Sequence, residues 1–425
     1  MENLRRPFKI FGFIVLPFIS TSIAFASGAG TAGGQILSVP VGARAIGMGE
    51  AYTAVADDVS SLYWNPAGLA ILNQSQASFM YNQDIQNLTF SHGAIATPLE
   101  NGGIGASLDY QSFGPISGYD AHDNPTGNVN AYSGVATIGG GWLGDFWSAG
   151  FNAKAIKGSL ADVSATGFAG DLGLNLIYPR EILGGTLRGA ATVRNLGTGL
   201  KYLQDNDPFP TEYRVGVAVV QMLDQKLNLS MDYGKARDNT GAIYTGAEFW
   251  LIRYIALRVG YAGNHTESNG LRVGLGLKLK DLSFDYALTQ DGDLGLSNRY
   301  ELTYRFGAIR PVLTPEERRI LRRGKLAMAH GDYAQATLLF NSLIEMEPNY
   351  MPVRKLIKTA MSGDEKNENF AANMKFKFVP DQRGTMVRPD NTPGEAEELE
   401  QLLSLGDTDS KQAQATKPAA SKEKM

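Results

Sequence analysis

Apolar residues occupy every second position in a long series of short segments between residues 75 and 306. The clearest is segment 271–279, which alternates Leu271, Val273, Leu275, Leu277 and Leu279 with Arg272, Gly274, Gly276 and Lys278. Because successive side chains of a β-strand point to opposite faces, each segment has one apolar and one polar face. A long series of such segments predicts a transmembrane β-barrel with an apolar outer surface and a polar lumen.

Fourteen segments carry this alternation, and an even number is typical of a bacterial single-chain barrel. We therefore expect an all-β transmembrane barrel of about 14 antiparallel strands over residues 73–307. The predicted strands are 75–82, 88–97, 102–111, 130–140, 146–157, 166–178, 186–195, 212–221, 226–235, 242–251, 254–262, 270–279, 281–289 and 299–307.

The lengths of the connections predict how the barrel is oriented. Connections after odd-numbered strands include two long ones, Ser112 to Val129 and Leu196 to Thr211, whereas those after even-numbered strands are mostly short. Outer-membrane barrels have short periplasmic turns and longer extracellular loops. The pattern predicts an outer-membrane protein whose N- and C-termini both lie on the periplasmic side.

Charged residues of both signs fall on the predicted inner face. A charge facing lipid at the bilayer midplane would cost about 2–4 kcal/mol, which identifies this face as the lumen. Two interpretations remain open: the charges guide a substrate, or they pair across strands and fill a narrow barrel. The residues are Arg214, Asp232, Glu248, Arg258, Arg272, Asp285, Arg299, Glu301 and Arg305.

Residues 1–26 have the pattern of a secretory signal peptide. Arg5, Arg6 and Lys9 precede an apolar stretch from Ile10 to Ile23, and Ala24-Phe25-Ala26 is a small-x-small cleavage site. The chain has no cysteine and a net charge of −4. Composition therefore gives no sign of a disulfide framework, an acylated cysteine or a nucleic-acid partner.

The segment between the signal peptide and the first strand is rich in small residues and does not alternate. Asp57 or Asp58 is expected to cap a short helix through Tyr63, and the sequence Asn65-Pro66-Ala67-Gly68 to end it with a turn. In an exported barrel protein, such a segment is suited to fold inside the lumen. Residues 27–72 are therefore predicted to form an N-terminal luminal plug.

Two stretches of the chain resemble the PorV/PorQ family, within the FadL-like group of outer-membrane proteins. They are GARAIGMGEAYTAVADDVSSLYWNPAGLA at 42–70 and LGLSNRYELTYRFG at 294–307. The resemblance implies a fourteen-stranded barrel with a luminal hatch, to which we assign Asn65, Pro66 and Gly68. It also implies one of two functions. FadL-like members carry hydrophobic molecules such as long-chain fatty acids, and PorV-like members hold secreted cargo proteins in type IX secretion.

After the last strand the pattern changes to helical. Thr314 as N-cap, Pro315 at N1 and Glu317 in a capping box predict a helix start. Residues 312–362 resemble one tetratricopeptide-type helix pair followed by a capping helix at 351–361. We expect this periplasmic extension to lean on the barrel rim, on another copy or on a periplasmic partner protein. The contact surface would be Leu326, Leu338, Leu339, Leu343 and Ile344, and the packing positions of the repeat are Gly324, Ala327, Gly331, Tyr333, Ala336, Phe340 and Pro348.

Residues 363–425 are polar and too poor in apolar residues to fold alone, so a largely disordered tail is predicted. A short amphipathic helix from Glu395 to Leu405 is the exception within it.

Nothing in the sequence indicates catalysis. The four histidines, His92, His122, His265 and His330, are scattered, and no metal-ligand or nucleophile motif is present, so no cofactor, metal or catalytic residue is expected. We interpret the chain as a non-enzymatic outer-membrane barrel that passes or hands over a hydrophobic molecule. The alternative is a component of protein secretion that binds a cargo protein.

Overall fold

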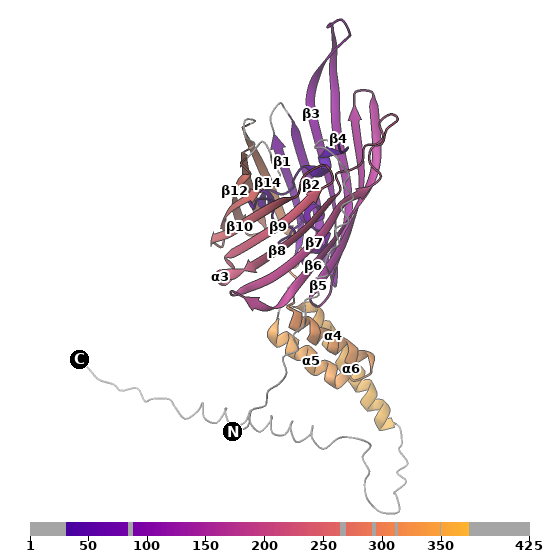
Figure 1. The fold of residues 1–425 in the computed structure, drawn as a ribbon. Coiled ribbons are helices and arrows are strands. Elements are labelled where there is room, and N and C mark those ends of the chain that lie inside the picture. Colours follow the sequence, from indigo (N-terminus) through magenta and orange to yellow (C-terminus); the bar gives the residue numbers. More distant parts are fainter. Residues whose placement is uncertain are drawn as a thin grey trace, which may run out of the picture. The chain divides into compact units, whose positions relative to one another are not determined.

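The computed structural model describes residues 31–83, 88–263, 269–290, 295–310, 313–348 and 350–373, in which fourteen antiparallel strands form one closed barrel (Figure 1). Each strand pairs with its neighbours in sequence, and β1(Ser75–Gln83) closes the ring against β14(Leu296–Phe306). The predicted fold class and strand number are confirmed. The other strands are β2(Thr89–Leu99), β3(Gly102–Tyr119), β4(Pro125–Leu143), β5(Trp147–Leu160), β6(Val163–Ile182), β7(Gly185–Gly197), β8(Glu212–Gln221), β9(Leu227–Ala236), β10(Ala242–Ile252), β11(Ile255–Ala262), β12(Leu271–Leu279) and β13(Leu282–Gln290).

The alternation in sequence is the alternation between membrane and lumen in the structure. In β9, Leu229 and Met231 are exposed on the outer surface, whereas Asn228, Ser230 and Asp232 are buried inside. A closed ring leaves no strand edge unpaired, which suits a wall that crosses hydrocarbon, where no water is present to bind free backbone groups. The sequence therefore specifies both the strands of the wall and which of their side chains point to the membrane or to the lumen.

The two ends of the barrel differ in their connections. We call the end that carries the connections after odd-numbered strands the loop end, and the opposite end the turn end. At the turn end, β8 and β9 are joined by α3(Met222–Gln225) and Lys226, and β12 and β13 by Lys280 and Asp281. At the loop end, residues 198–211 connect β7 to β8.

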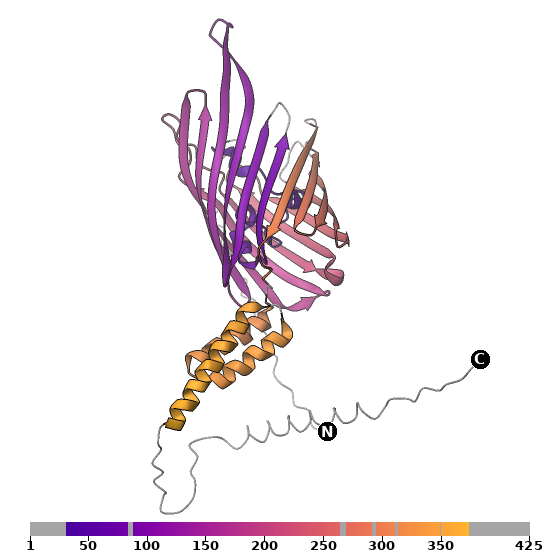
Figure 2. The ribbon, with the colours of Figure 1, turned by 180° about the vertical axis from the view of Figure 1, so that it is seen from behind.

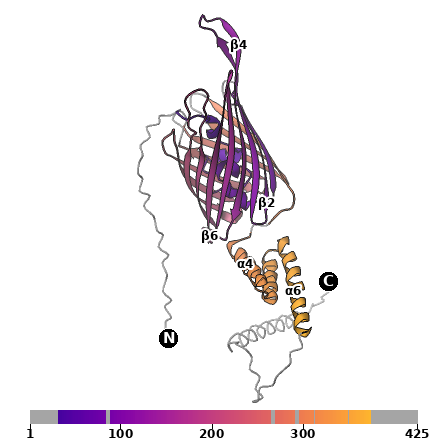
Figure 3. The same cartoon turned by 90° about the vertical axis from the view of Figure 1, so that its right-hand side faces the viewer.

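One predicted loop is instead a strand extension. The segment Ser112 to Val129 was expected to be an outer loop, but β3 and β4 continue as a hairpin and leave only residues 120–124 between them. β3 has 18 residues and β4 has 19, against the 9–11 that cross a bilayer. The tip of the hairpin stands clear of the other strands (Figure 3).

Residues 31–72 lie inside the barrel, where parts of this segment are seen in indigo between the strands (Figure 2). We call this segment the plug. Most of its side chains are buried, above all from Val41 onward. Its elements are η1(Gln35–Ser38), α1(Ala43–Gly47), α2(Ser61–Trp64) and η2(Pro66–Ile71).

Three helices follow the barrel, and together we call them the helical unit: α4(Pro315–Ala329), α5(Tyr333–Met346) and α6(Met351–Asn373). Gly324 allows α4 to approach α5, because a Cβ atom there would lie 2.4 Å from the ring of Phe340. Ala327, Ala336 and Phe340 share the core of this unit. The predicted contact surface is wrong for Leu343, which is buried in that core, whereas Leu338 is exposed. Tyr333 packs its ring against Gly363, and Pro348 is exposed.

The helical unit has contacts with two turns of the barrel. Arg318 Nη2 donates to the carbonyl oxygen of Asp145 at 2.6 Å, Arg322 pairs with the Asp145 carboxylate at 3.0 Å, and Lys325 pairs with Glu100 at 2.9 Å. Helix α6 runs to Asn373, so the predicted boundary of a disordered tail at 363 is wrong. The predicted helix at 395–405 lies outside the described residues. No helix among the described residues is long and apolar enough to cross a membrane.

The start of α4 has the predicted capping box. Thr314 Oγ1 accepts from the backbone N–H of Glu317, and the Glu317 carboxylate accepts from the N–H of Thr314 at 2.6 Å. We expect Thr314→Ala to destabilise the helical unit by about 1 kcal/mol, because one of the free N–H groups at the helix start loses its acceptor. Limited proteolysis in increasing urea measures this. Thr359→Ala on the exposed face of α6 is the control, and an equal effect of the two substitutions would contradict the role of the cap.

Candidate functional site

The plug crosses the lumen from the loop end to the turn end. The backbone N–H of Gly33 donates to the carbonyl oxygen of Pro208, between β7 and β8, at 2.9 Å. At the other end of the plug, the side chain of Gln74 donates to the carbonyl oxygen of Gly307, just after β14, at 3.1 Å. Residues 31–34 therefore lie at the loop end, whereas β1 begins and β14 ends at the turn end. An even strand number places β1 and β14 but not a segment that runs back through the lumen. The predicted signal peptide lies outside the described residues.

Arg44 of α1 fixes the plug to the barrel wall. Its guanidinium binds both carboxylate oxygens of Glu248 in β10, with Nε–Oε2 and Nη2–Oε1 distances of 2.8 and 2.9 Å. The same group binds Asp57 at 2.6 Å and Asp58 at 3.1 Å within the plug. Glu248 is fully buried and also accepts from Arg258 Nε at 2.8 Å. The bidentate geometry makes this a strong and specific connection.

Most of the charged wall residues predicted from the alternation form hydrogen bonds or ion pairs with the plug, in addition to those that they form with one another. Glu301 Oε2 accepts from the backbone N–H of Ala43 at 2.8 Å, and Asp232 Oδ2 accepts from the N–H and hydroxyl of Thr53 at 2.9 and 2.6 Å. Eight of the nine predicted residues are buried inside the barrel: Arg214, Asp232, Glu248, Arg258, Arg272, Asp285, Arg299 and Glu301. Arg258 also pairs with Asp285 at 2.6 Å, and the ninth position, Arg305, donates to Ser283.

The segment from Asn65 to Gly68 connects the two halves of the plug to the wall. Asn65 Nδ2 donates to the carbonyl oxygen of Thr53 at 2.9 Å and to Asn175 Oδ1 in β6 at 2.6 Å. Its Oδ1 accepts from the N–H of Ala67 at 3.1 Å and so begins η2, with Pro66 at the first helical position. The expected turn is therefore a helix start.

Helix α2 is also capped differently from the prediction. Its N-cap residue is Ser60, not Asp57 or Asp58. The Asp58 carboxylate instead accepts from the backbone N–H of Ser60 itself at 3.0 Å. Gly68 is required for close packing, because a Cβ atom there would lie 2.3 Å from the carbonyl oxygen of Ala56. The hatch residues thus pack the plug against itself and against β6.

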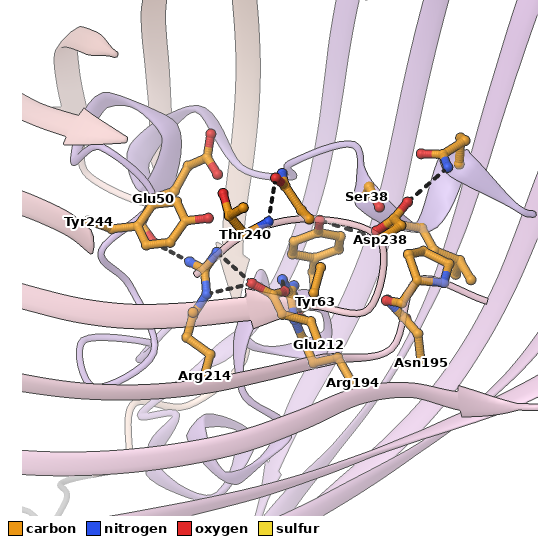
Figure 4. A pocket seen from close by; sticks show the side chains of 16 residues that line it. Ser38, Glu50, Tyr63, Arg194, Asn195, Glu212, Arg214, Asp238, Thr240 and Tyr244 are labelled. Atoms are coloured by element: carbon orange, nitrogen blue, oxygen red, sulfur yellow. Dashed lines mark hydrogen bonds and ion pairs between the residues drawn. The ribbon is translucent and has the colours of Figure 1, made fainter. Parts of the chain in front are cut away.

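A charged pocket of about 230 Å³ lies at the loop end (Figure 4). Arg194 and Arg214 both form ion pairs with Glu212, and the Arg214 pair measures 2.8 Å between Nη2 and Oε1. The guanidinium of Arg194 lies 4.5 Å from the ring centre of Tyr63, and that of Arg214 lies 4.0 Å from the ring centre of Tyr244. The two cations are thus already bound by protein groups.

A second polar pocket of about 350 Å³ lies at the turn end, beneath the ion pairs of Arg44. Lys278 and Arg305 line it together with Asp57 and Asp58. It and the charged pocket lie at opposite ends of the plug.

The third pocket differs in its chemistry and is called the apolar pocket. It has a volume of about 340 Å³ and lies at the loop end, between the start of the plug and the ends of β3, β4 and β5. The pocket was not predicted, because two of its apolar side chains, Phe113 and Ile116, come from the stretch that was expected to be an outer loop. Its lining residues are Ala32, Gly33, Gly34, Gln35, Ile36, Gln111, Phe113, Ile116, Ala131, Ser133, Ser159, Leu160 and Tyr202.

Two glycines at the loop end leave room for the aromatic side chains of Tyr202, which lines this pocket, and of Phe209. A Cβ atom on Gly158 would lie 1.9 Å from the hydroxyl of Tyr202, and one on Gly34 would lie 3.0 Å from the ring of Phe209. Gly34 has a φ of 65°, a conformation that glycine adopts without strain. The start of the plug therefore forms part of the pocket wall.

One titratable pair inside the barrel was not predicted. His92 Nδ1 lies 2.5 Å from Asp109 Oδ1, and both line a space of only about 10 Å³ with Lys154. That volume is at the limit for a single water molecule, so it gives no room for a substrate. Over the described ranges, no cluster of three or more His, Asp or Glu side chains is arranged to hold a metal ion.

The comparisons with known proteins are distant. The sequence model of an uncharacterised protein family, UPF0164, matches residues 22–146, which is less than half of the chain. Similar solved structures include the Ralstonia pickettii toluene transporter TbuX, at 14% identity over 63% of this chain and 98% of that chain, with a TM-score of 0.47. The Pseudomonas putida toluene transporter TodX is 13% identical over 62% of this chain and 96% of that chain, with a TM-score of 0.44. A Pseudomonas aeruginosa FadL homologue is 12% identical over 63% of this chain and 99% of that chain, with a TM-score of 0.37. No curated protein matches the chain.

Proposed function

We propose that this protein is a non-enzymatic outer-membrane barrel that takes up a small hydrophobic molecule at its loop end and hands it on through the barrel. The observation that carries the proposal is the apolar pocket, whose wall includes both the barrel and the start of the plug. Small-molecule sites are concave, mostly apolar and supplied with a few polar groups. In this proposal the loop end faces outside and the turn end faces the periplasm.

The plug makes the proposed passage selective. Asn65, Arg44 and Asp232 take part in hydrogen bonds between plug and wall, so an open water-filled channel is not part of the proposal. A molecule bound against Gly33, Gly34 and Ile36 touches the plug itself. Its binding can therefore shift the plug from a closed to an open position only if the molecule makes better contacts with the open position.

The related structures named as toluene transporters are consistent with a substrate of this size. A pocket of about 340 Å³ holds one ring or a short alkyl chain, whereas a long-chain fatty acid would place only part of its chain there. We therefore propose a substrate smaller than the fatty acid that the sequence resemblance implies.

Native mass spectrometry of the gently purified full chain tests the proposal. We expect a bound apolar small molecule that Ala131→Phe displaces, because Ala131 is buried in the pocket wall and a ring there fills the space. Ala106→Phe, on the outer face of β3, is the matched control and should retain the molecule. Retention by both variants, or a preparation without any apolar ligand, would contradict uptake at this pocket.

A role in PorV-like protein secretion is the second candidate, and the long β3–β4 hairpin favours it. Its exposed aromatic residues, such as Tyr119 at 63% exposure, offer a surface for a cargo protein. In that case the helical unit would bind a periplasmic partner as a tetratricopeptide-like repeat. A stoichiometric secreted protein in the same mass spectrum, lost when residues 116–127 are removed, would favour secretion over small-molecule uptake.

A further inference from the structure

One polar side chain in the apolar pocket has incomplete hydrogen bonding. Gln111, in β3, is only 6% exposed, and its Oε1 atom has no hydrogen-bond partner. Its neighbours across the sheet are Phe90 in β2 and Ser133 in β4, and Phe90 is buried. A buried amide oxygen without a donor is unfavourable, so such groups in native proteins require an explanation. A bound molecule that supplies the donor is one.

The remainder of the pocket lining excludes a charged ligand. Its apolar side chains include Ile36, Phe113, Ile116 and Leu160, and its polar side chains are neutral. No lysine, arginine or histidine is among the lining residues that the structure describes. A carboxylate that entered this space would lose its hydration without gaining a cation, which is strongly unfavourable. The lining therefore favours an uncharged molecule.

We propose that the apolar pocket binds an uncharged apolar molecule that carries one hydroxyl group, with this hydroxyl hydrogen-bonded to the side-chain amide of Gln111. The inference rests on the proposed uptake function and specifies its substrate class. A hydroxyl group both donates and accepts, so it satisfies either end of the amide. The apolar body of the ligand then lies against Phe113, Ile116 and Leu160.

The hydroxyl group is the source of the expected selectivity. A hydrocarbon of the same shape fills the pocket but leaves the Gln111 oxygen unpaired. Sites built around a buried hydrogen bond reject analogues that lack the bonding group far more strongly than apolar sites reject analogues that differ by one methylene. The pocket is therefore expected to prefer an alcohol or phenol over the matching hydrocarbon.

Three probes of nearly equal size test this with the full-length protein in detergent at pH 7. They are p-cresol, which is uncharged at this pH, toluene, which lacks the hydroxyl, and 4-methylbenzoate, which is an anion. Isothermal titration calorimetry is expected to show p-cresol binding at least tenfold more tightly than toluene, and 4-methylbenzoate binding more weakly than both.

The substitution Gln111→Leu should weaken p-cresol binding about tenfold and change toluene binding by less than threefold. Gln204→Leu, at an exposed position between β7 and β8 outside the pocket lining, is the matched control and should leave all three probes unchanged. If Gln111→Leu does not fold, as judged by the heat-dependent gel mobility of the barrel, Gln111→Asn replaces it. The shorter amide should lose the p-cresol preference in the same way.

The possible outcomes separate the two proposals. Equal affinities for p-cresol and toluene, unchanged p-cresol binding in both Gln111 variants, or tightest binding of 4-methylbenzoate would each overturn the hydroxyl inference and leave uptake of hydrophobic molecules standing. If none of the three probes binds the unsubstituted protein, the proposed uptake at this pocket fails together with the inference.

Discussion

Replacing Glu248 with glutamine is expected to lower the free energy of unfolding by about 3–5 kcal/mol, as is typical when one partner of a buried ion pair is removed. Glu248 is fully buried and binds Arg44 of the plug, Arg258 of β11 and Asn228 of β9. A neutral amide leaves these guanidinium groups with less negative charge around them. Because the lost interactions join plug to wall, the plug should loosen before the barrel unfolds.

Urea titration in detergent micelles, followed by tryptophan fluorescence, measures the change in stability. Trp64 lies in the plug and the other three tryptophans lie in barrel strands, so these three are replaced by phenylalanine in every variant. The Trp64 signal should then change at a lower urea concentration than the heat-dependent gel mobility of the barrel. Glu181→Gln at an exposed position of β6 is the matched control. A loss at Glu248 no larger than at Glu181 would show that the ion pairs do not hold the plug.

The substitution Gly150→Val is expected to displace the plug from the wall. A Cβ atom on Gly150 would lie 2.3 Å from the carbonyl carbon of Pro66, and this backbone atom has no flexible end that can move aside. Overpacking of a well-packed interior costs about 1–3 kcal/mol, and more where backbone must shift. The plug can leave its position whereas the barrel, held by its strand pairing, cannot.

Conductance in planar lipid bilayers measures this directly, because a displaced plug opens the lumen to ions. We expect Gly150→Val to conduct and the unsubstituted protein to remain closed. Gly189→Val is the matched control, since a Cβ atom at this wall position of β7 meets no atom within 4 Å. Conductance from Gly189→Val, or a closed Gly150→Val barrel of normal stability, would contradict the close contact between β5 and η2.

The barrel wall could be predicted from the sequence because its physical requirement is local. A strand that separates lipid from lumen must alternate, and the predicted strand 270–279 is observed as Leu271–Leu279. The same rule predicts that the side chains of Glu248 and Asp232 point into the lumen. What these carboxylates bind does not, since the partners Arg44 and Thr53 lie about 200 and 179 residues away in a segment with no periodicity.

The pockets were beyond prediction for a related reason. Phe113 and Ile116 lie on either side of Gly114 and Pro115, which break the alternation and were interpreted as a loop. Beyond the bilayer a strand no longer has to alternate, so its sequence loses the only signal that identified the other strands. The direction of the plug is likewise set by contacts at its two ends, such as that of Gly33 with Pro208, that no local pattern encodes.

Covalent continuity between the plug and β1 determines how a displaced plug returns to the lumen during transport. Leu72 is three residues from the first residue of β1, so a plug that leaves its place stays tethered at the turn end. Its return is an intramolecular step whose rate depends on the effective concentration set by the tether, not on the amount of protein in the membrane. In the proposed uptake, the resealing of one barrel is therefore expected to be independent of the number of its neighbours.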